Sequence, residues 1–193
     1  MSRRTASAVL GVALALAASQ VPAAKAAERG LTYMVPAASG SVQRVSDVTN
    51  AQRQVLPDLV ISDGSNIPVH LSRYRGYVVV LNFYSVSCGP CIKDLLYLNR
   101  LQGNLKGFPI QVVPVSEDGL QPKAVKAFLA HQNLGFLKPF GDPNGGTAET
   151  LGLKGLPSTV IVDKAGRLAG AVAGNVVWDS PDMQNSLEKL TRE

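Results

Sequence analysis

Residues 77–91 read Tyr77-Val-Val-Val-Leu-Asn-Phe-Tyr84-Ser-Val-Ser-Cys88-Gly-Pro-Cys91. The apolar, β-branched run from Tyr77 to Tyr84 predicts a central strand that is buried on both faces. A helix is expected to begin at Pro90, because proline suits the first turn of a helix. Its apolar positions recur at helical spacing and predict one buried face: Cys91, Leu95, Leu98, Leu101 and Leu105. The two cysteines therefore stand at a strand-to-helix junction.

The spacing of Cys88 and Cys91 predicts a redox-active pair. Two intervening residues place both sulfurs in the first helical turn, where unpaired amides and the helix dipole favour a thiolate. The thiol pKa should then fall below its free value of about 8.5. A structural disulfide across so short a loop would constrain the unfolded chain little. Zinc would need two further ligands, yet His70 and His131 lie outside any zinc-like spacing. We therefore expect no metal and no other cofactor.

The composition suits one folded domain. The chain has 193 residues, of which 46% are hydrophobic and 17% charged. These values argue against a disordered chain, and two cysteines are too few for a disulfide-stapled mini-protein. A polytopic membrane protein would need apolar runs of about 20 residues, which are absent from the sequence. The net charge of +5 falls to +2 without residues 1–26, because these hold three basic residues and no acid. Binding of nucleic acid is therefore not indicated.

The amino terminus reads as a secretory signal over residues 1–26. A basic start is followed by an apolar run from Ala8 to Ala18 and by small residues at positions 24 and 26. The mature chain is expected to start near Ala27 and to work outside the cytoplasm, with an uncleaved membrane anchor as the alternative. Residues 27–55 lack a long apolar period and are expected to be a flexible extension. The folded domain is expected over residues 56–193.

The remaining elements alternate between strands and helices. Short strands at 59–61 and 67–71 flank a turn cluster and predict a β-hairpin. The later elements expected are a strand at 110–115, a helix at 121–132, a short helix at 147–153, strands at 158–162 and 168–174, and a last helix opened by Asp179-Ser180-Pro181. This order predicts an α/β fold: a mixed sheet with helices on both faces, preceded by the hairpin.

A second signature, Gly155-Leu-Pro-Ser-Thr159, stands at the start of an apolar strand. Together with the cysteine motif it identifies a family. From about Pro57 to Leu190 the chain resembles the thioredoxin superfamily, and more closely its extracytoplasmic TlpA/ResA-like branch. The matching segments are 78–84, 88–94, 155–163 and 176–179. The resemblance implies a thioredoxin-like fold.

The resemblance also implies roles for single residues. Cys88 corresponds to the exposed attacking cysteine, and Cys91 to the buried resolving cysteine. Pro157 corresponds to the cis-proline beside the disulfide. Its neighbouring backbone, at Leu156, would align an extended segment of the client protein. Together with Asp94, these four residues form the expected catalytic and substrate-binding site.

Two polar positions depart from the cytoplasmic thioredoxins. Asn82 falls where those proteins have a buried aspartate, so that acid is absent here. Asp94 falls where ResA-like members carry a glutamate near the cysteines. Because it follows Cys91 by three residues on one helical face, Asp94 could move protons to or from Cys91. The alternative is an acid that only complements the dipole of the first helical turn.

Three further residues receive simpler interpretations. Ser87 precedes the first cysteine where many relatives have tryptophan, which implies a more polar groove. Glu117 follows a strand near the expected active edge and is interpreted as a loop acid. Trp178 is interpreted as a packing residue.

The expected function is thiol–disulfide exchange with client proteins. The resemblance favours a reductase that receives electrons from a membrane thiol–disulfide donor and reduces apocytochrome c or copper-site cysteines. The chain is expected to be a monomer in the periplasm or otherwise outside the cytoplasm. One alternative is a thiol peroxidase. Those folds have proline seven residues before the attacking cysteine and threonine or serine three before, whereas this chain has Leu81 and Ser85. Another is a copper(I)-binding module that uses both thiolates, although no methionine or histidine cluster supports it.

Overall fold

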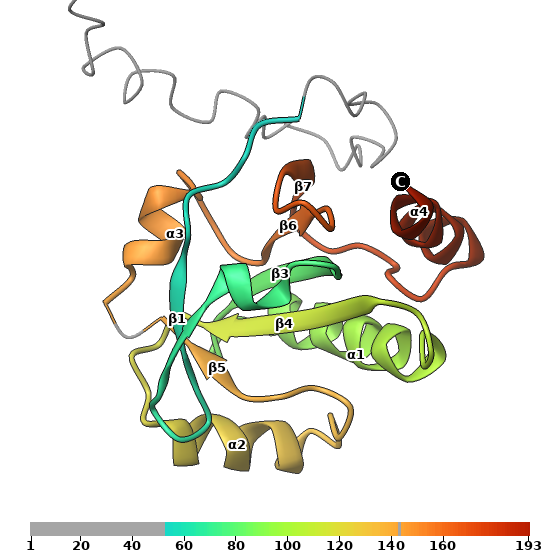
Figure 1. The fold of residues 1–193 in the computed structure, drawn as a ribbon. Helices are drawn as coiled ribbons and strands as arrows, with labels where there is room; N and C mark the ends of the chain where they lie inside the picture. The colour runs from blue at the N-terminus through green and yellow to red at the C-terminus, as the bar shows by residue number, and fades with distance from the viewer. Residues whose placement is uncertain (1–52, 143) are drawn as a thin grey trace, which may run out of the picture. The chain divides into compact units, whose positions relative to one another are not determined.

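The computed structural model describes residues 53–142 and 144–193. Within them a mixed sheet of seven strands runs in the order β2-β1-β5-β4-β3-β6-β7 (Figure 1). The strands are β1 (Val60–Asp63), β2 (Pro68–His70), β3 (Val78–Tyr84), β4 (Ile110–Ser116), β5 (Phe140–Gly141), β6 (Ser158–Val162) and β7 (Leu168–Ala173). β4 is parallel to both β3 and β5, whereas the other neighbours are antiparallel. The predicted hairpin is confirmed as the pair β1–β2.

Helices cover both faces of the sheet, as predicted (Figure 1). They are α1 (Gly89–Asn104), α2 (Pro122–His131), α3 (Gly146–Thr150), α4 (Pro181–Arg192) and a short 3₁₀ helix, Leu71–Tyr74. Buried side chains of α1, α2 and α4 join one core cluster. The opposite cluster contains Leu71 of the 3₁₀ helix and Leu151, directly after α3.

Strand β3 lies at the centre of the molecule, and all seven of its side chains are buried. Val78, Val80 and Tyr84 belong to the same core cluster as α1. The alternate residues of the strand join the opposite cluster. Because strand side chains alternate between faces, Asn82 falls on the α1 face. A buried amide therefore stands below the helix that carries the cysteines.

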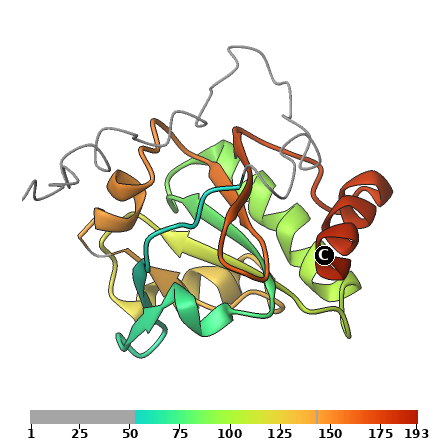
Figure 2. The same ribbon diagram turned by 45° about the horizontal axis from the view of Figure 1, so that its top comes forward.

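The folded domain begins earlier than predicted. The Arg53 side chain is buried and pairs with Asp163 and Glu193. Val55 forms a β-bridge with Arg167, so the cyan start of the described chain reaches the β6–β7 hairpin (Figure 2). The assignment of residues 53–55 to a flexible extension was wrong, because these residues are held by ion pairs and backbone hydrogen bonds. The predicted signal and the rest of the extension lie outside the described residues.

Two further differences concern single elements. Helix α1 begins at Gly89 with Cys88 as its N-cap, one residue before the predicted start. Strand β5 was not predicted, because two residues cannot show an alternating pattern. Across residues 53–142 and 144–193, no helix has the length and apolar character needed to cross a membrane.

Candidate active site

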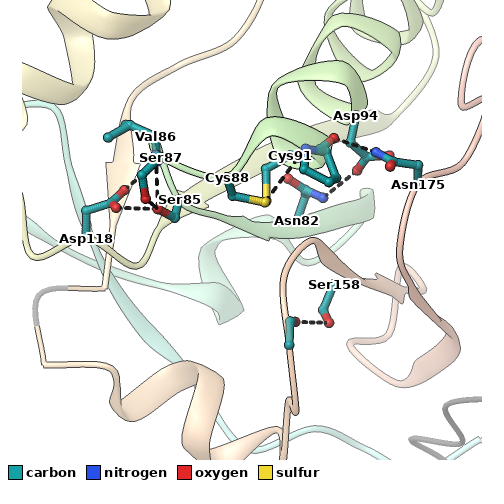
Figure 3. The surroundings of a disulfide bond; sticks show 12 residues. Asn82, Ser85, Val86, Ser87, Cys88, Cys91, Asp94, Asp118, Ser158 and Asn175 are labelled. Atoms are coloured by element: carbon teal, nitrogen blue, oxygen red, sulfur yellow. Dashed lines mark hydrogen bonds between the residues drawn. A yellow bond between two sulfur atoms is a disulfide. The ribbon is translucent and has the colours of Figure 1, made fainter.

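Cys88 and Cys91 form a disulfide at the amino-terminal end of α1 (Figure 3). The two sulfurs are 2.06 Å apart and the Cα atoms 5.2 Å. Cys88 is only partly buried, whereas Cys91 is fully buried in the core beneath α1. The backbone N–H of Cys91 donates to the Cys88 Sγ at 3.2 Å, so the N-cap sulfur occupies the helix terminus. The prediction of one accessible and one enclosed sulfur agrees with this geometry.

The loop between β3 and α1 is held by Asp118, just after β4. The Ser85 hydroxyl donates to Asp118 Oδ1 at 2.6 Å, and the Val86 N–H donates to Oδ2 at 2.9 Å (Figure 3). The Ser116 hydroxyl donates to the same Oδ2. One carboxylate thus fixes the segment that presents Cys88. The role of Asp118 was not predicted, because 32 residues separate it from Val86 in the chain.

Asp94 is fully buried under α1, although it lies in the second turn of that helix. Its Oδ1 accepts the Val176 N–H at 3.0 Å and the Trp178 Nε1–H at 2.9 Å. Burial raises the pKa of Asp94 from 3.8 to about 6, although the hydrogen bonds that it accepts act in the opposite direction. An acid that only complements the helix dipole would be solvated, so the environment favours the alternative of a tuned carboxyl group.

Asn82 links Asp94 to the sheet. Its Nδ2 donates to Asp94 Oδ2 at 2.9 Å and to the Thr159 hydroxyl at 2.8 Å (Figure 3 shows Asn82 beside Asp94). Trp178 is buried as predicted, but it also donates to Asp94 and is therefore more than a packing residue. Neither contact could be read from the sequence, since 12 and 84 residues separate the partners.

The segment from Gly155 to Ser158 lies among the surroundings of the disulfide (Figure 3). β6 pairs with β3 so that Ser158 stands opposite Phe83. This register brings Pro157 to the end of β3, where the chain turns toward Cys88. The Leu156–Pro157 peptide bond is cis, as the resemblance implied. Leu156 is exposed and Pro157 is buried.

Glu117, directly after β4, is influenced by two other acids, Asp118 and Asp142. Glu117 is partly buried, and burial together with the negative charges of Asp142 and Asp118 raises its pKa to about 7. It accepts no described side-chain hydrogen bond at Oε1. No hydrogen bond among the described residues joins Glu117 to either sulfur, and its interpretation as a loop acid stays a prediction. Across residues 53–142 and 144–193, no group of three or more His, Cys, Asp or Glu side chains could hold a metal ion.

Comparison with known proteins identifies the family. Residues 53–171, more than half of the chain, match the model of the AhpC/TSA family. The chain belongs to the AhpC/TSA family. Among curated members of similar sequence, the thiol-disulfide oxidoreductase ResA of Geobacillus thermodenitrificans is 30% identical over 136 residues, which cover 69% of this chain and 75% of ResA. ResA of Bacillus thuringiensis subsp. konkukian is 27% identical over 135 residues, which cover 70% of this chain and 76% of that ResA.

Solved structures show the same fold for this AhpC/TSA family member. A crystal structure described as a thiol:disulfide interchange protein DsbE from Chlorobium tepidum is 29% identical, with a TM-score of 0.63 over 72% of this chain and 96% of that one. A secreted thiol-disulfide isomerase from Corynebacterium glutamicum has a TM-score of 0.64 over 75% and 90%; at 24% identity it supports the fold alone. The protein is thus a thiol–disulfide oxidoreductase with a thioredoxin-like fold, as predicted.

Proposed function

We propose that this oxidoreductase is an extracytoplasmic reductase of disulfides in client proteins, in which Cys88 attacks and Cys91 resolves. The observation that carries the proposal is the different burial of the two sulfurs. A protein-sized client can reach Cys88 at the helix terminus, whereas Cys91 is enclosed by the core. Thiol–disulfide exchange needs this order, because the second cysteine must wait until a mixed disulfide has formed.

The reaction transfers two electrons from the protein to the client. The Cys88 thiolate attacks one client sulfur, and the other client sulfur leaves as a thiolate that takes up a proton. The Cys91 thiolate then attacks the Cys88 sulfur, which releases the second client sulfur and forms the Cys88–Cys91 disulfide. The described structure corresponds to this oxidised state. An external thiol donor must reduce the disulfide before the next cycle.

Asp94 is proposed to handle the proton of Cys91. The enclosed Cys91 thiol must lose its proton before it attacks. Asp94 lies three residues further along α1 on the same helical face. A carboxyl pKa of about 6 allows this group to exchange a proton near neutral pH.

The exposed backbone at Leu156 is proposed to align the client. Among the described hydrogen bonds, none uses the N–H or the C=O of Leu156, whereas the Pro157 carbonyl accepts the N–H of Gly174. An extended client segment could therefore pair with Leu156 beside the disulfide. Ser85 and Ser87 line the approach to Cys88, so polar client segments are expected to fit.

The cellular setting rests on the amino terminus. Residues 1–26 have the three parts of a secretory signal. In an oxidising compartment a reductase needs an electron supply, for which a membrane thiol–disulfide donor is proposed. The proposed clients are proteins with paired cysteines, such as apocytochrome c or copper-site proteins. The protein is proposed to act as a monomer. Amino-terminal sequencing of the exported chain should find a start near Ala27.

A single-turnover assay tests the activity. The chain is reduced, freed of reductant and mixed with a peptide that carries one disulfide. One equivalent of protein should yield one equivalent of peptide dithiol and the Cys88–Cys91 disulfide, and Cys88→Ser should yield none. Rapid turnover of hydrogen peroxide without peptide reduction would favour a peroxidase instead. Tight copper(I) binding without exchange would favour a metal-binding module.

A further inference from the structure

In the Asn82 side-chain amide, the NH₂ group makes hydrogen bonds but the carbonyl oxygen does not. Both hydrogens of Nδ2 are used, one toward Asp94 Oδ2 and one toward the Thr159 hydroxyl. The carbonyl oxygen Oδ1 of the same amide is buried and has no hydrogen-bond partner. An unpaired buried acceptor costs free energy, so such groups are uncommon in folded proteins. Its presence next to a carboxyl group indicates that it is used in another state of the site.

The donors around Asp94 suit only the ionised carboxylate. The Val176 N–H and the Trp178 indole N–H both point at Oδ1, and neither group can accept a hydrogen bond. At Oδ2 the partner is the Nδ2 of Asn82, which is also a donor. The Asn175 side chain also hydrogen-bonds to the carboxyl group and lowers its pKa, as a donor to the ionised form does. A proton on Oδ2 would therefore face an amide hydrogen rather than an acceptor.

Half a rotation of the Asn82 amide about its Cβ–Cγ bond removes this conflict. Oδ1 then takes the place of Nδ2, where it can accept both the proton of Asp94 and the hydroxyl proton of Thr159. The Thr159 hydroxyl serves either arrangement, because it can donate as well as accept. The indole of Trp178 has no such second arrangement and favours the carboxylate alone.

We propose that Asn82 and Trp178 are positioning residues for proton transfer. Trp178 stabilises Asp94 as a carboxylate. The Asn82 amide rotates by half a turn about its Cβ–Cγ bond when Asp94 receives the proton of Cys91. This inference rests on the proposed proton transfer between Cys91 and Asp94. In that step the Cys91 S–H bond breaks and an O–H bond forms at Asp94 Oδ2, with no change in total charge. After the disulfide has formed, the proton returns to solvent or to the departing client thiolate.

The described residues that shift the pKa of Asp94 are uncharged. Burial raises this pKa, and hydrogen bonds from Val176, Trp178, Asn82 and Asn175 lower it. On α1 the neighbouring titratable groups are Cys91, the adjacent Lys93, whose side chain is exposed, and the partly buried Tyr97. From the sheet, β6 contributes the neutral Thr159 to the Asn82 amide, and β4 places Pro114 opposite Asn82.

The test compares Trp178→Phe with Asn82→Leu in stopped-flow measurements of both exchange steps from pH 5 to 9. Trp178→Phe keeps an aromatic ring but removes a donor to the charged form alone, so the midpoint of the release step should rise by about one pH unit. Asn82→Leu removes a partner of both forms, so release should slow severalfold with a much smaller shift. Tyr84→Phe is the matched control, since it removes a buried hydroxyl that has no partner from the same core.

The outcomes separate this inference from the proposed function. If Cys88 still attacks the peptide but Trp178→Phe leaves the release midpoint unchanged, or Asn82→Leu shifts it as far as Trp178→Phe does, the inference is overturned. Loss of the first attack in the wild-type chain would overturn the proposed function itself. A measurement on the wild-type protein tests the inference even if the variants do not fold. The side-chain ¹⁵N resonance of Asn82 should change with pH at the midpoint of the Asp94 titration. A resonance that does not depend on pH would contradict the rotation of the amide.

Discussion

Cys88 and Cys91 differ in their surroundings although only Gly89 and Pro90 separate them. Cys88 lies at the N-cap of α1, where the helix dipole stabilises a thiolate, whereas Cys91 is fully buried. In the reduced protein Cys88 should therefore be alkylated first, with an apparent pKa below the free value of about 8.5. Peptide mapping by mass spectrometry after brief alkylation at several pH values measures both rates. Equal rates would contradict the assignment.

The buried carboxyl of Asp94 leads to a second prediction at this scale. Asp94→Asn keeps the size of the side chain but cannot carry the Cys91 proton, so release of the client should slow at least tenfold at pH 7 while the first attack stays near the wild-type rate. Stopped-flow measurement with a disulfide peptide resolves the two steps. Asp182→Asn, at an exposed position of α4, is the control. Unchanged release would remove Asp94 from the site.

At the scale of elements, the β3–α1 loop depends on a residue from the neighbouring strand. Asp118 accepts hydrogen bonds from Ser85 and from the Val86 N–H. Asp118→Ala leaves these donors without a partner and should lower the free energy of unfolding by about 1–3 kcal/mol. Urea unfolding of the disulfide-bonded protein measures the loss, with Asp182→Ala as the exposed control. An effect no larger than that of the control would show that the loop holds its shape without Asp118.

The elements that the sequence predicts best are those with long, regular patterns. The β3 strand and the α1 helix were predicted within one residue, because an apolar run and a first-turn proline mark them. β5 was missed, since its two residues show no period. Residues 53–55 were assigned to the extension, because a polar segment gives no local sign that Arg53 finds Asp163, 110 residues away.

The candidate site was predicted only in part for the same reason. Cys88, Cys91 and the cis bond before Pro157 follow from short motifs and the family resemblance. The environment of Asp94 depends on Trp178, which becomes a neighbour only after the sheet has formed. Local spacing could suggest that Asp94 faces Cys91, but it could not show burial, which sets the proton affinity of the carboxyl group.

For the whole molecule, the raised pKa of Asp94 predicts a dependence of stability on pH. Between pH 3.8 and about 6 the unfolded chain loses this proton while the folded protein keeps it, so the free energy of unfolding falls as pH rises through this range. Asp94→Asn lacks this contribution. Its stability relative to the wild type should rise by about 2 kcal/mol from pH 4 to pH 7. Urea unfolding of both disulfide-bonded proteins at each pH tests this, and a constant difference would contradict it.

The central claim is that Cys88 attacks client disulfides and Cys91 resolves them, and trapping of the intermediate tests it most directly. The Cys91→Ser protein, produced with its signal in an exporting cell, cannot complete the second step. It should accumulate mixed disulfides with client proteins, and mass spectrometry should place every such bond at Cys88. Cys88→Ser should trap none. Equal trapping by the two variants, or mixed disulfides at Cys91, would contradict the account.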